Sequence, residues 1–538
     1  MAAIIHQTDK RSGITYAYES ISYWDKEKKQ SRAKRKLIGR VDKESGEIVP
    51  TDGRGRNRKT SADQNAYVGV VKSGTFTSRY FYGATYLFDA IGDKLGLTED
   101  LKQCFGDTYK QILSIAYYLI LEGDTPLLRF EKWGLLHKHP YGKDIPSQRS
   151  SELFVSITEE SKNQFFKRWG RHKDEKEFWA YDTTSISSYS EQLRQIQYGH
   201  NKENDLLAQL NLAVVFGESS NLPFYYRKLA GNIPDSKTLI HLLADLNQLD
   251  FAKVKLVMDR GFYSKENINA LFEAHLKFLV SASMSRSFVQ KELENIKDEF
   301  RSYEHYLPDY ELYAHTVQTT WDYKRVRPYK KDTVEEKKRI YLHYYFNIQR
   351  AAEDEKAFDK KLIAYKEELL QGRSIKEHQS FYDKYFIIKQ TPKRGINIQI
   401  RTDAVNKAKR NYGFFVLLSN EKMDSTRALE IYRNKDVVEK AFGNLKERLN
   451  MRRLLVSSEQ SLDGKLFVEF IALIYLSYIK KQMQVNGLYK KYTLHTMLDK
   501  LDVIECFEHP GKKLRVGETL QKQKEIYEAM GIEAPSSL

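Results

Sequence analysis

Two aspartates follow short apolar runs of the kind that form buried strands. Asp182 comes directly after residues 178–181, Phe-Trp-Ala-Tyr, and Asp259 directly follows 255–258, Lys-Leu-Val-Met. A carboxylate at the end of an apolar strand is poorly solvated unless it faces a cleft or binds a cation. If the two strands lie side by side, both carboxylates can reach one metal ion. For each acid taken alone, the alternative is a turn-forming or helix-capping role.

A third acid lies on a segment with helical periodicity, which predicts one long helix over about 425–450. Tyr432, Lys435, Glu439 and Lys446 follow one another at offsets of 0, 3, 7 and 14. At about 100° per residue these positions fall within roughly 60° of one stripe of the helix. The stripe would present an acid for a metal, two cations for phosphate and an aromatic ring for a base. The alternative is a solvent-exposed face with Glu–Lys pairs.

Phosphodiester cleavage and strand transfer require this set of groups. A water or a 3′-hydroxyl must be deprotonated, and the leaving oxyanion must be neutralised. Two Mg²⁺ ions about 3.5–4 Å apart do both, and hard cations prefer carboxylate oxygens. We therefore expect Asp182 to bridge two ions, Asp259 and Glu439 each to complete one coordination shell, and Mn²⁺ to substitute for Mg²⁺.

The spacing of the stripe resembles the Tyr-Arg-Glu-Lys signature of bacterial insertion-sequence transposases of the DDE class. The one departure is Lys435, where that family usually has Arg; the charge is kept, but bidentate gripping of phosphate is lost. Three further segments, in the same order, resemble the first-aspartate motif, the second-aspartate motif and the segment after the signature helix: Tyr181-Asp182-Thr183-Thr184-Ser185, Asp259-Arg260-Gly261-Phe262-Tyr263-Ser264 and Asp463-Gly464-Lys465-Leu466-Phe467-Val468. The resemblance spans about 178–479.

The resemblance implies roles for residues beyond the three acids. Tyr432, Lys435 and Lys446 would bind phosphates near the transposon end. Relatives that form a DNA hairpin stack an aromatic residue of an inserted domain on a displaced base, and Trp321 is the candidate here, although a lone Trp is more often a core residue. The remaining candidates are Arg260 and Arg149 for DNA contact and Asn232 and Asp235 for shaping the site.

The implied activity is that of an insertion-sequence transposase, which cuts transposon ends and joins their 3′-hydroxyls to target DNA. Its partners would be double-stranded DNA, both ends and target, and a second copy of the chain in a homodimeric synaptic complex. The expected location is cytoplasmic and nucleoid-associated in a bacterium. Two alternatives remain open: a metal-dependent DNA nuclease that cuts without joining, and a non-catalytic DNA-binding derivative.

Composition is compatible with a nucleic-acid partner. The 538 residues carry 88 Lys and Arg against 72 Asp and Glu, for a net charge of +16, and 41% are hydrophobic. Such a balance favours a polyanion partner, with an ordinary basic protein as the alternative. Two cysteines can form neither a disulfide framework nor a Cys-type zinc site, which is typical of a reducing compartment. We expect no signal peptide and no membrane span, because the most apolar window, 466–479, contains Glu469 and predicts a buried helix.

Basic residues are concentrated near the N-terminus, where 1–60 hold 15 Lys and Arg against 8 Asp and Glu. With β-like runs such as 14–18 and basic clusters at 32–40 and 54–59, residues 1–75 are predicted to be a DNA-contacting β module; a solvated charged face is the alternative. Residues 76–172 change to helical periodicity and predict a DNA-binding or scaffold domain, in which Ser147 caps a helix that contains Arg149.

An α/β pattern with a mixed sheet follows, and its order matches the ribonuclease H-like fold. Three strands (178–181, 210–216, 222–228) precede a helix (236–249), a strand (254–258), a helix (264–274) and a strand (278–280). We assign 173–284 to the first part of this core, 285–411 to an inserted β-rich domain with a charged helix at 351–370, and 412–484 to the second part of the core. Residues 485–538 are a C-terminal helical region and a candidate for dimerisation.

Overall fold

The computed structural model describes residues 2–536 except for 11, 26–28, 44, 50–76, 124, 191–192, 200–201, 203–205, 252, 327–332, 392–394, 448, 450–457 and 510. The chain forms two compact units, Met1–Thr75 and Phe76–Leu538.

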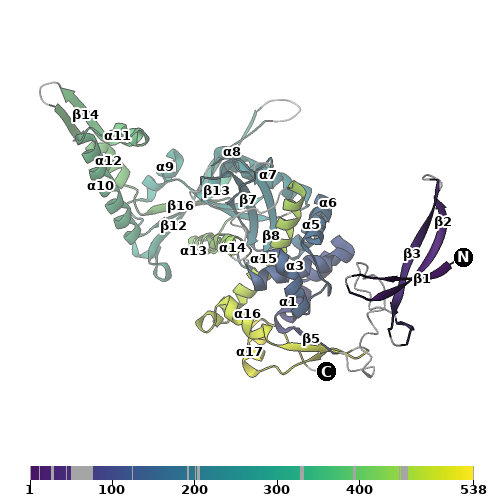
Figure 1. Cartoon of the computed structure of the whole chain (residues 1–538). Helices are drawn as coiled ribbons and strands as arrows, with labels where there is room; N and C mark the ends of the chain where they lie inside the picture. The colour runs from purple at the N-terminus through teal and green to yellow at the C-terminus, as the bar shows by residue number, and fades with distance from the viewer. Residues whose placement is uncertain are drawn as a thin grey trace. The chain divides into compact units, whose positions relative to one another are not determined.

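The first unit is a four-stranded antiparallel sheet with the order β1-β2-β3-β4 (Figure 1). The run at 14–18 falls largely within β2, as its alternating pattern indicates. The basic cluster at 32–40 lies on β3, of which nearly every side chain is exposed, whereas the cluster at 54–59 lies outside the described residues. The strands are β1 (Ala2–Thr8), β2 (Thr15–Asp25), β3 (Gln30–Val41) and β4 (Ile48–Val49).

The second unit begins with helices that confirm the helical periodicity of that segment. They are α1 (Gly83–Leu95), α2 (Leu97–Phe105), α3 (Tyr109–Glu122), α4 (Phe130–Leu136), α5 (Ser147–Ser156) and α6 (Glu159–Trp169). The N-cap of α5 is Pro146, with no side-chain capping bond, so the expected Ser147 cap is wrong. Ser147 instead opens the helix, because proline, with φ fixed near −60°, can stand at the cap position.

The C-terminal part of the chain packs on these first helices. Helix α15 (Glu459–Val485) contains the apolar window 466–479, is buried there as predicted, and contacts α3 and α5. It is followed by α16 (Leu494–Asp502), β17 (Glu505–Glu508), β18 (Arg515–Val516) and α17 (Gln521–Ala529), and β17 pairs with β5 (Ser78–Phe81). Across the described residues, we find no helix with the length and apolarity that crossing a membrane requires.

A nine-stranded mixed sheet forms the centre of the second unit, with the order β11-β12-β13-β16-β10-β9-β6-β7-β8. Strand β9 is parallel to both β6 and β10, and the other neighbours are antiparallel. The mixed-sheet α/β class predicted from the sequence is confirmed. The strands are β6 (Phe178–Ser187), β7 (Gln209–Gly217), β8 (Pro223–Ala230), β9 (Lys255–Met258), β10 (Lys277–Ala282), β11 (Tyr306–Leu307), β12 (Leu312–Val326), β13 (Thr333–Phe346) and β16 (Phe414–Ser419).

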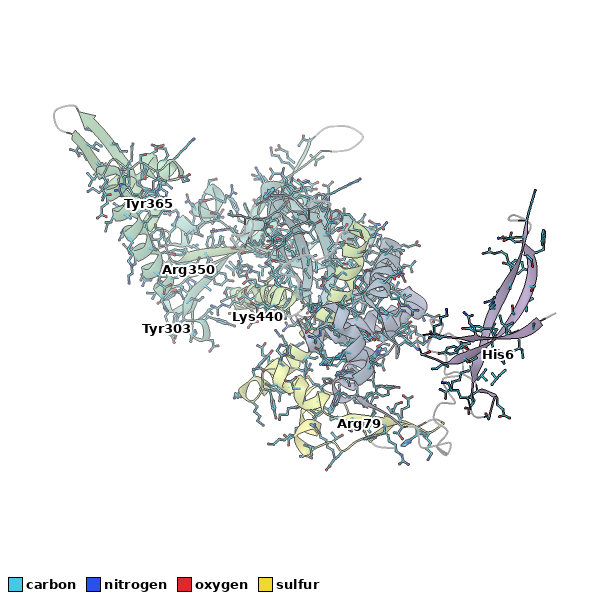
Figure 2. All side chains as sticks on the ribbon, viewed as in Figure 1. His6, Arg79, Tyr303, Arg350, Tyr365 and Lys440 are labelled. Carbon is cyan, nitrogen blue, oxygen red and sulfur yellow. The ribbon has the colours of Figure 1, made fainter. Side chains whose placement is uncertain are left out.

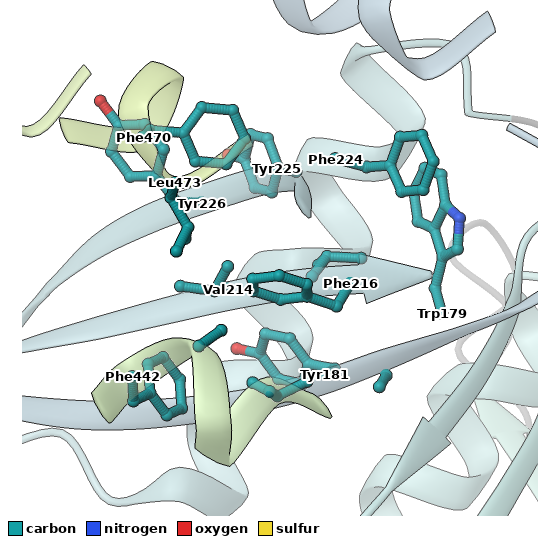
Figure 3. Close-up of a cluster of buried hydrophobic side chains, with 14 of the residues drawn as sticks. Trp179, Tyr181, Val214, Phe216, Phe224, Tyr225, Tyr226, Phe442, Phe470 and Leu473 are labelled. Carbon is teal, nitrogen blue, oxygen red and sulfur yellow. The ribbon is translucent and has the colours of Figure 1, made fainter. Parts of the chain in front are cut away.

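The sheet is held by apolar side chains on both of its faces. Strands β6 and β7 are buried along almost their whole length. The first four residues of β6 are apolar, whereas its second part, 182–187, buries mainly hydroxyl side chains. Figure 3 shows aromatic residues of β6, β7 and β8 packed with Phe470 and Leu473 of α15 and with Phe442. Helices α7 (Asp235–Gln248) and α8 (Lys265–Glu273) connect β8 to β9 and β9 to β10.

The segment expected to be an inserted domain, 285–411, has two structurally different parts. After α9 (Ser287–Ile296), the long hairpin β12–β13 extends the central sheet through β16. The second part has a small core of its own that includes Leu362, Tyr382 and Ile398. It consists of α10 (Ile348–Leu370), α11 (Gln379–Tyr385), β14 (Phe386–Thr391), β15 (Gly395–Ile400) and α12 (Thr402–Lys409).

The long helix predicted over 425–450 is wrong. The structure has two helices, α13 (Ser425–Asn434) and α14 (Asp436–Glu447), with Lys435 between them. Asn and Asp, which flank Lys435, favour helix ends because their side chains compete for backbone hydrogen bonds, and the Asn434 side-chain amide donates to Glu218 at 2.8 Å. Tyr432 and Glu439 therefore lie on different helices, and Lys446 is buried on α14.

Candidate active site

Asp182 and Asp259 lie at adjacent positions of two parallel strands. In the register between β6 and β9, Tyr181 is opposite Met258, so each aspartate directly follows that pair. Neighbouring strands are about 4.8 Å apart. The structure thus brings together the two carboxylates that the apolar runs singled out.

The Asp182 carboxylate is largely buried, with 21% of its side chain exposed. Its Oδ1 accepts the backbone N–H of Thr183 at 2.7 Å and lies 3.5 Å from Lys202 Nζ. Burial raises the pKa of Asp182, and the positive charge of Lys202 offsets this only in part. A carboxylate that is hard to ionise without a cation is suited to receiving one.

Asp259 has the opposite electrostatic balance. Burial acts to raise its pKa, but a hydrogen bond from the Tyr432 hydroxyl at 2.6 Å, the Arg260 backbone and the charge of Lys435 outweigh it, so the pKa of Asp259 is lowered. The same contact and burial raise the pKa of Tyr432. Tyr432 thus orients an ionised carboxylate.

Lys435 links the two aspartates to the third acid. It is 9% exposed, and its charge contributes to the lowered pKa of Asp259 and opposes part of the rise in the pKa of Asp182 that burial causes. Its Nζ lies 3.6 Å from Glu439 Oε1, while the Glu439 side chain is 62% exposed. Glu439 therefore reaches the aspartates through Lys435 rather than directly.

The donor set fits a hard divalent cation in part. The carboxylates of Asp182, within β6, and Asp259, directly after β9, supply the oxygen ligands that Mg²⁺ prefers, and Lys202 and Lys435 supply the positive charge that a metal would otherwise bring. Within the part of the chain that the structure describes, no three His, Cys, Asp or Glu side chains are arranged to hold a metal ion. Glu439 would have to leave Lys435 to join Asp182 and Asp259.

Two further polar residues belong to the site. Lys202 Nζ lies 3.2 Å from Asp235 Oδ2 as well as 3.5 Å from Asp182 Oδ1. The Thr183 hydroxyl donates to Asp235. The sequence indicated Asp235 only by resemblance, and it gave no signal for Lys202, which lies in a long connection between β6 and β7 without periodicity.

The cavity beside Asp259 has a volume of about 860 Å³ and opens toward α10. Arg260, Tyr432 and Arg433 line it together with Arg350, which stands near the start of α10 (Figure 2). Three acids, Asp259, Glu353 and Asp354, share this lining with the three arginines, so the cavity presents both signs of charge. Of the other predicted DNA-contacting residues, Arg149 is exposed on α5, and the structure gives it no contact with either aspartate.

Trp321 lies on β12 in the core of the unit. It is 6% exposed, its indole N–H donates to Asn269 at 2.9 Å, and its ring packs edge-on against Phe288. Stacking on a DNA base would require the ring to leave this position. The stacking role stays a prediction.

Trp321→Ala is expected to lower the free energy of unfolding by about 3–5 kcal/mol, because it leaves a cavity in the core. Trp321→Phe keeps most of the packing and loses one hydrogen bond, at a cost of about 1 kcal/mol. Urea denaturation of the three proteins measures both. An Ala variant as stable as the natural protein would mean that the ring is not held in the core and is available to DNA.

The transposase DDE domain family matches this chain over residues 173–475. The match covers more than half of the chain, and the chain belongs to this family. A solved structure, the piggyBac transposase synaptic complex with hairpin DNA, is similar with a TM-score of 0.33 and 8% identity over 78% of this chain and 76% of that chain. No match was found among curated proteins.

Proposed function

We propose that this protein is the DNA transposase of an insertion sequence, and that it cuts transposon ends and joins their 3′-hydroxyls to target DNA. The observation that carries the proposal is that Asp182, within β6, and Asp259, directly after β9, follow the last residue pair of these two parallel strands, within a domain of the transposase DDE family. The strand order is β8-β7-β6-β9-β10; β6, β9 and β10 are parallel neighbours, and β7 is antiparallel to both β6 and β8. This arrangement supports a ribonuclease H-like core.

In this proposal Asp182, Asp259 and Glu439 hold two Mg²⁺ ions, for which Mn²⁺ substitutes. Bound there, the ions activate the attacking oxygen and neutralise the leaving one. Tyr432 fixes the orientation of Asp259 through its hydroxyl. When DNA binds, Lys435 leaves its ion pair with Glu439 and pairs with a DNA phosphate. Arg260 and Arg433 bind phosphates along the cavity beside Asp259.

The remaining roles follow the same proposal. Lys446 and Arg149 contact DNA, and Trp321 stacks on a displaced base if the ring leaves the core. The partners are double-stranded transposon ends and target DNA, held by a homodimer, in the cytoplasm and nucleoid of a bacterium.

A product assay tests the proposal. The full chain is incubated with Mg²⁺, a supercoiled target plasmid and a duplex that contains a candidate transposon end. The duplex is labelled on the strand whose 3′-hydroxyl would be joined to the target. Cleaved ends joined to the plasmid support a transposase, whereas cleaved ends that stay free indicate a nuclease without joining activity. The enzymatic proposal is contradicted if the protein binds this DNA without cutting it while a related active enzyme cuts the same ends.

The N-terminal sheet is expected to contribute to DNA affinity through β3. Arg32 and Lys34 are exposed and share one face of the strand, where each phosphate contact adds about 0.9 to the slope of log affinity against log salt. Arg32→Ala/Lys34→Ala should weaken binding to any duplex and lower that slope by about 2. Fluorescence anisotropy over a salt series measures it.

The matched control is Lys490→Ala/Lys491→Ala, which removes the same charge from another exposed segment. If both double variants lose the same affinity, the effect reports net charge alone and the sheet has no special role in binding DNA.

A further inference from the structure

The first residue of α7, Asp235, lies beside the middle of β6, where Asp182 is located. On the β6 side, the Thr183 hydroxyl donates to the Asp235 carboxylate. Lys202 completes this contact, since its Nζ donates to the Thr183 carbonyl at 2.6 Å and lies within 3.5 Å of both Asp182 and Asp235. Thr183 directly follows Asp182, so Asp235 holds the side chain next to that ligand.

On the β9 side, the same helix start is clamped to the turn that follows Asp259. Asn267, which is 1% exposed, donates its side-chain N–H groups to the Ser236 carbonyl at 2.7 Å and to the Phe262 carbonyl at 2.8 Å. Gly261 of this turn faces the Asp235 carboxylate, since a Cβ added there would lie 3.7 Å from Asp235 Oδ2. The start of α7 is thus bonded to β6 through Asp235 and to the turn after Asp259 through Asn267.

The loop that leads into Asp235 is itself fixed by buried amides. Gln209 and Asn211 of β7 donate to the Gly231 carbonyl, and Asn211 also donates to the Ile233 carbonyl at 3.1 Å. Gly231 packs so closely that a Cβ there would lie 2.1 Å from the Gln209 carbonyl oxygen. A carboxylate at the end of such a loop has little freedom, which is what a residue that sets the position of others requires.

The geometry points to Asp235 as a positioning residue that holds Asp182 and Asp259 at the separation that a divalent cation needs. This inference rests on the proposed function. Groups that hydrogen-bond around metal-binding carboxylates fix their orientation, and their loss typically weakens metal affinity or activity by about 10- to 100-fold. Asp235 is bonded to Thr183 beside Asp182, and its neighbour Ser236 is tied through Asn267 to the turn after Asp259, so the start of α7 acts on both ligands.

Another acid of α7 provides a matched comparison. Asp245 is buried and binds Arg227 and the Tyr225 hydroxyl, the latter at 2.7 Å, at the far end of the helix from Asp235. Its role is therefore structural. Asp235→Asn and Asp245→Asn remove the same charge from the same helix, and only the first should affect the metal ligands.

Calorimetric titration of the full chain with Mn²⁺ in the absence of DNA tests the inference. Thermal melting is the second readout. Asp235→Asn is expected to bind Mn²⁺ about 10- to 100-fold more weakly with a melting temperature close to that of the natural protein. Asp245→Asn is expected to melt earlier and to bind Mn²⁺ normally. Unchanged Mn²⁺ affinity in Asp235→Asn would overturn the positioning role.

Thr183→Val removes the hydroxyl that joins Asp235 to β6 and keeps the size of the side chain, so it decides the matter if Asp235→Asn does not fold. It should weaken Mn²⁺ binding in the same direction, and in a folded double variant the two losses should not add, because they break one connection. Additive losses would contradict a shared path. If the natural protein binds no Mn²⁺ at all, the proposed function itself fails; if it binds Mn²⁺ and both variants do too, only the positioning role fails.

Discussion

Asp182→Asn and Asp259→Asn are each expected to slow cleavage of transposon-end DNA by at least about 10³-fold. An amide keeps the size of the carboxylate and removes the charge that draws a divalent cation between β6 and β9. The cation contributes several kcal/mol to the stabilisation of the transition state, and about 4 kcal/mol corresponds to about 10³ in rate. Single-turnover cleavage of an end-labelled duplex with Mg²⁺ measures the loss.

Thermal melting without metal separates this loss from misfolding, and the two variants should move in opposite directions. Burial raises the pKa of Asp182, so its ionised form costs stability at pH values above that pKa, and Asp182→Asn should melt later at pH 7. The pKa of Asp259 is lowered despite burial, through the Tyr432 hydroxyl, so its charge adds stability above the unfolded pKa, and Asp259→Asn should melt earlier.

Asp144→Asn, on the exposed segment before α5, provides the control and should keep full activity. Cleavage above about a tenth of the natural rate in either aspartate variant would remove that residue from the catalytic set, since so small a loss is below 1.4 kcal/mol.

The strands that hold these aspartates were predictable where their residues are apolar. The runs before Asp182 and Asp259 form the first part of β6 and the whole of β9, but β6 continues through Asp182 to Ser187, so the prediction that Asp182 follows the strand is wrong. Their adjacency did not follow from the runs themselves. It depends on pairing between residues more than seventy positions apart in the chain, which local patterns do not encode.

The break between α13 and α14 was missed because it leaves the apolar pattern nearly in phase. Leu429 and Val438 are both buried, and Lys435 keeps helical backbone angles, with φ −58° and ψ −20°, so the three- and four-residue spacing is not disturbed. Asn434 and Asp436 were the available signal, since both residue types favour helix ends. The predicted stripe from Tyr432 to Lys446 therefore spans two helices, α13 and α14.

Lys202 and the packing of Trp321 were beyond the reach of the sequence for another reason. Lys202 contacts Asp182 only because the connection after β6 returns to the middle of that strand, and such connections have no periodicity. Trp321 is buried because the hairpin β12–β13 extends the central sheet under α8 and α9. Both facts depend on tertiary arrangement rather than on local preference.

The position of Glu439 leads to a second large effect, of a different kind. Glu439→Gln is expected to bind Mn²⁺ without DNA within about twofold of the natural protein, yet to cleave DNA at least about 100-fold more slowly. The reason is that Glu439 lies on α14, largely exposed, with Lys435 as its partner, while Asp182 and Asp259 are already together. Losing a ligand needed only in the DNA complex costs about 3 kcal/mol in the reaction and little in the free protein.

Mn²⁺ titration and single-turnover cleavage of the same preparations measure the two effects, with Glu447→Gln as a control on the same helix. Asp182→Asn should lose both metal affinity and cleavage, whereas Glu439→Gln should lose only cleavage. A loss of Mn²⁺ affinity in Glu439→Gln as large as in Asp182→Asn would mean that Glu439 is a ligand before DNA arrives. In the expected case, a DNA phosphate replaces Glu439 as the ion-pair partner of Lys435. Glu439 then joins Asp182 and Asp259, so that the metal site is completed only when the DNA to be cut is bound.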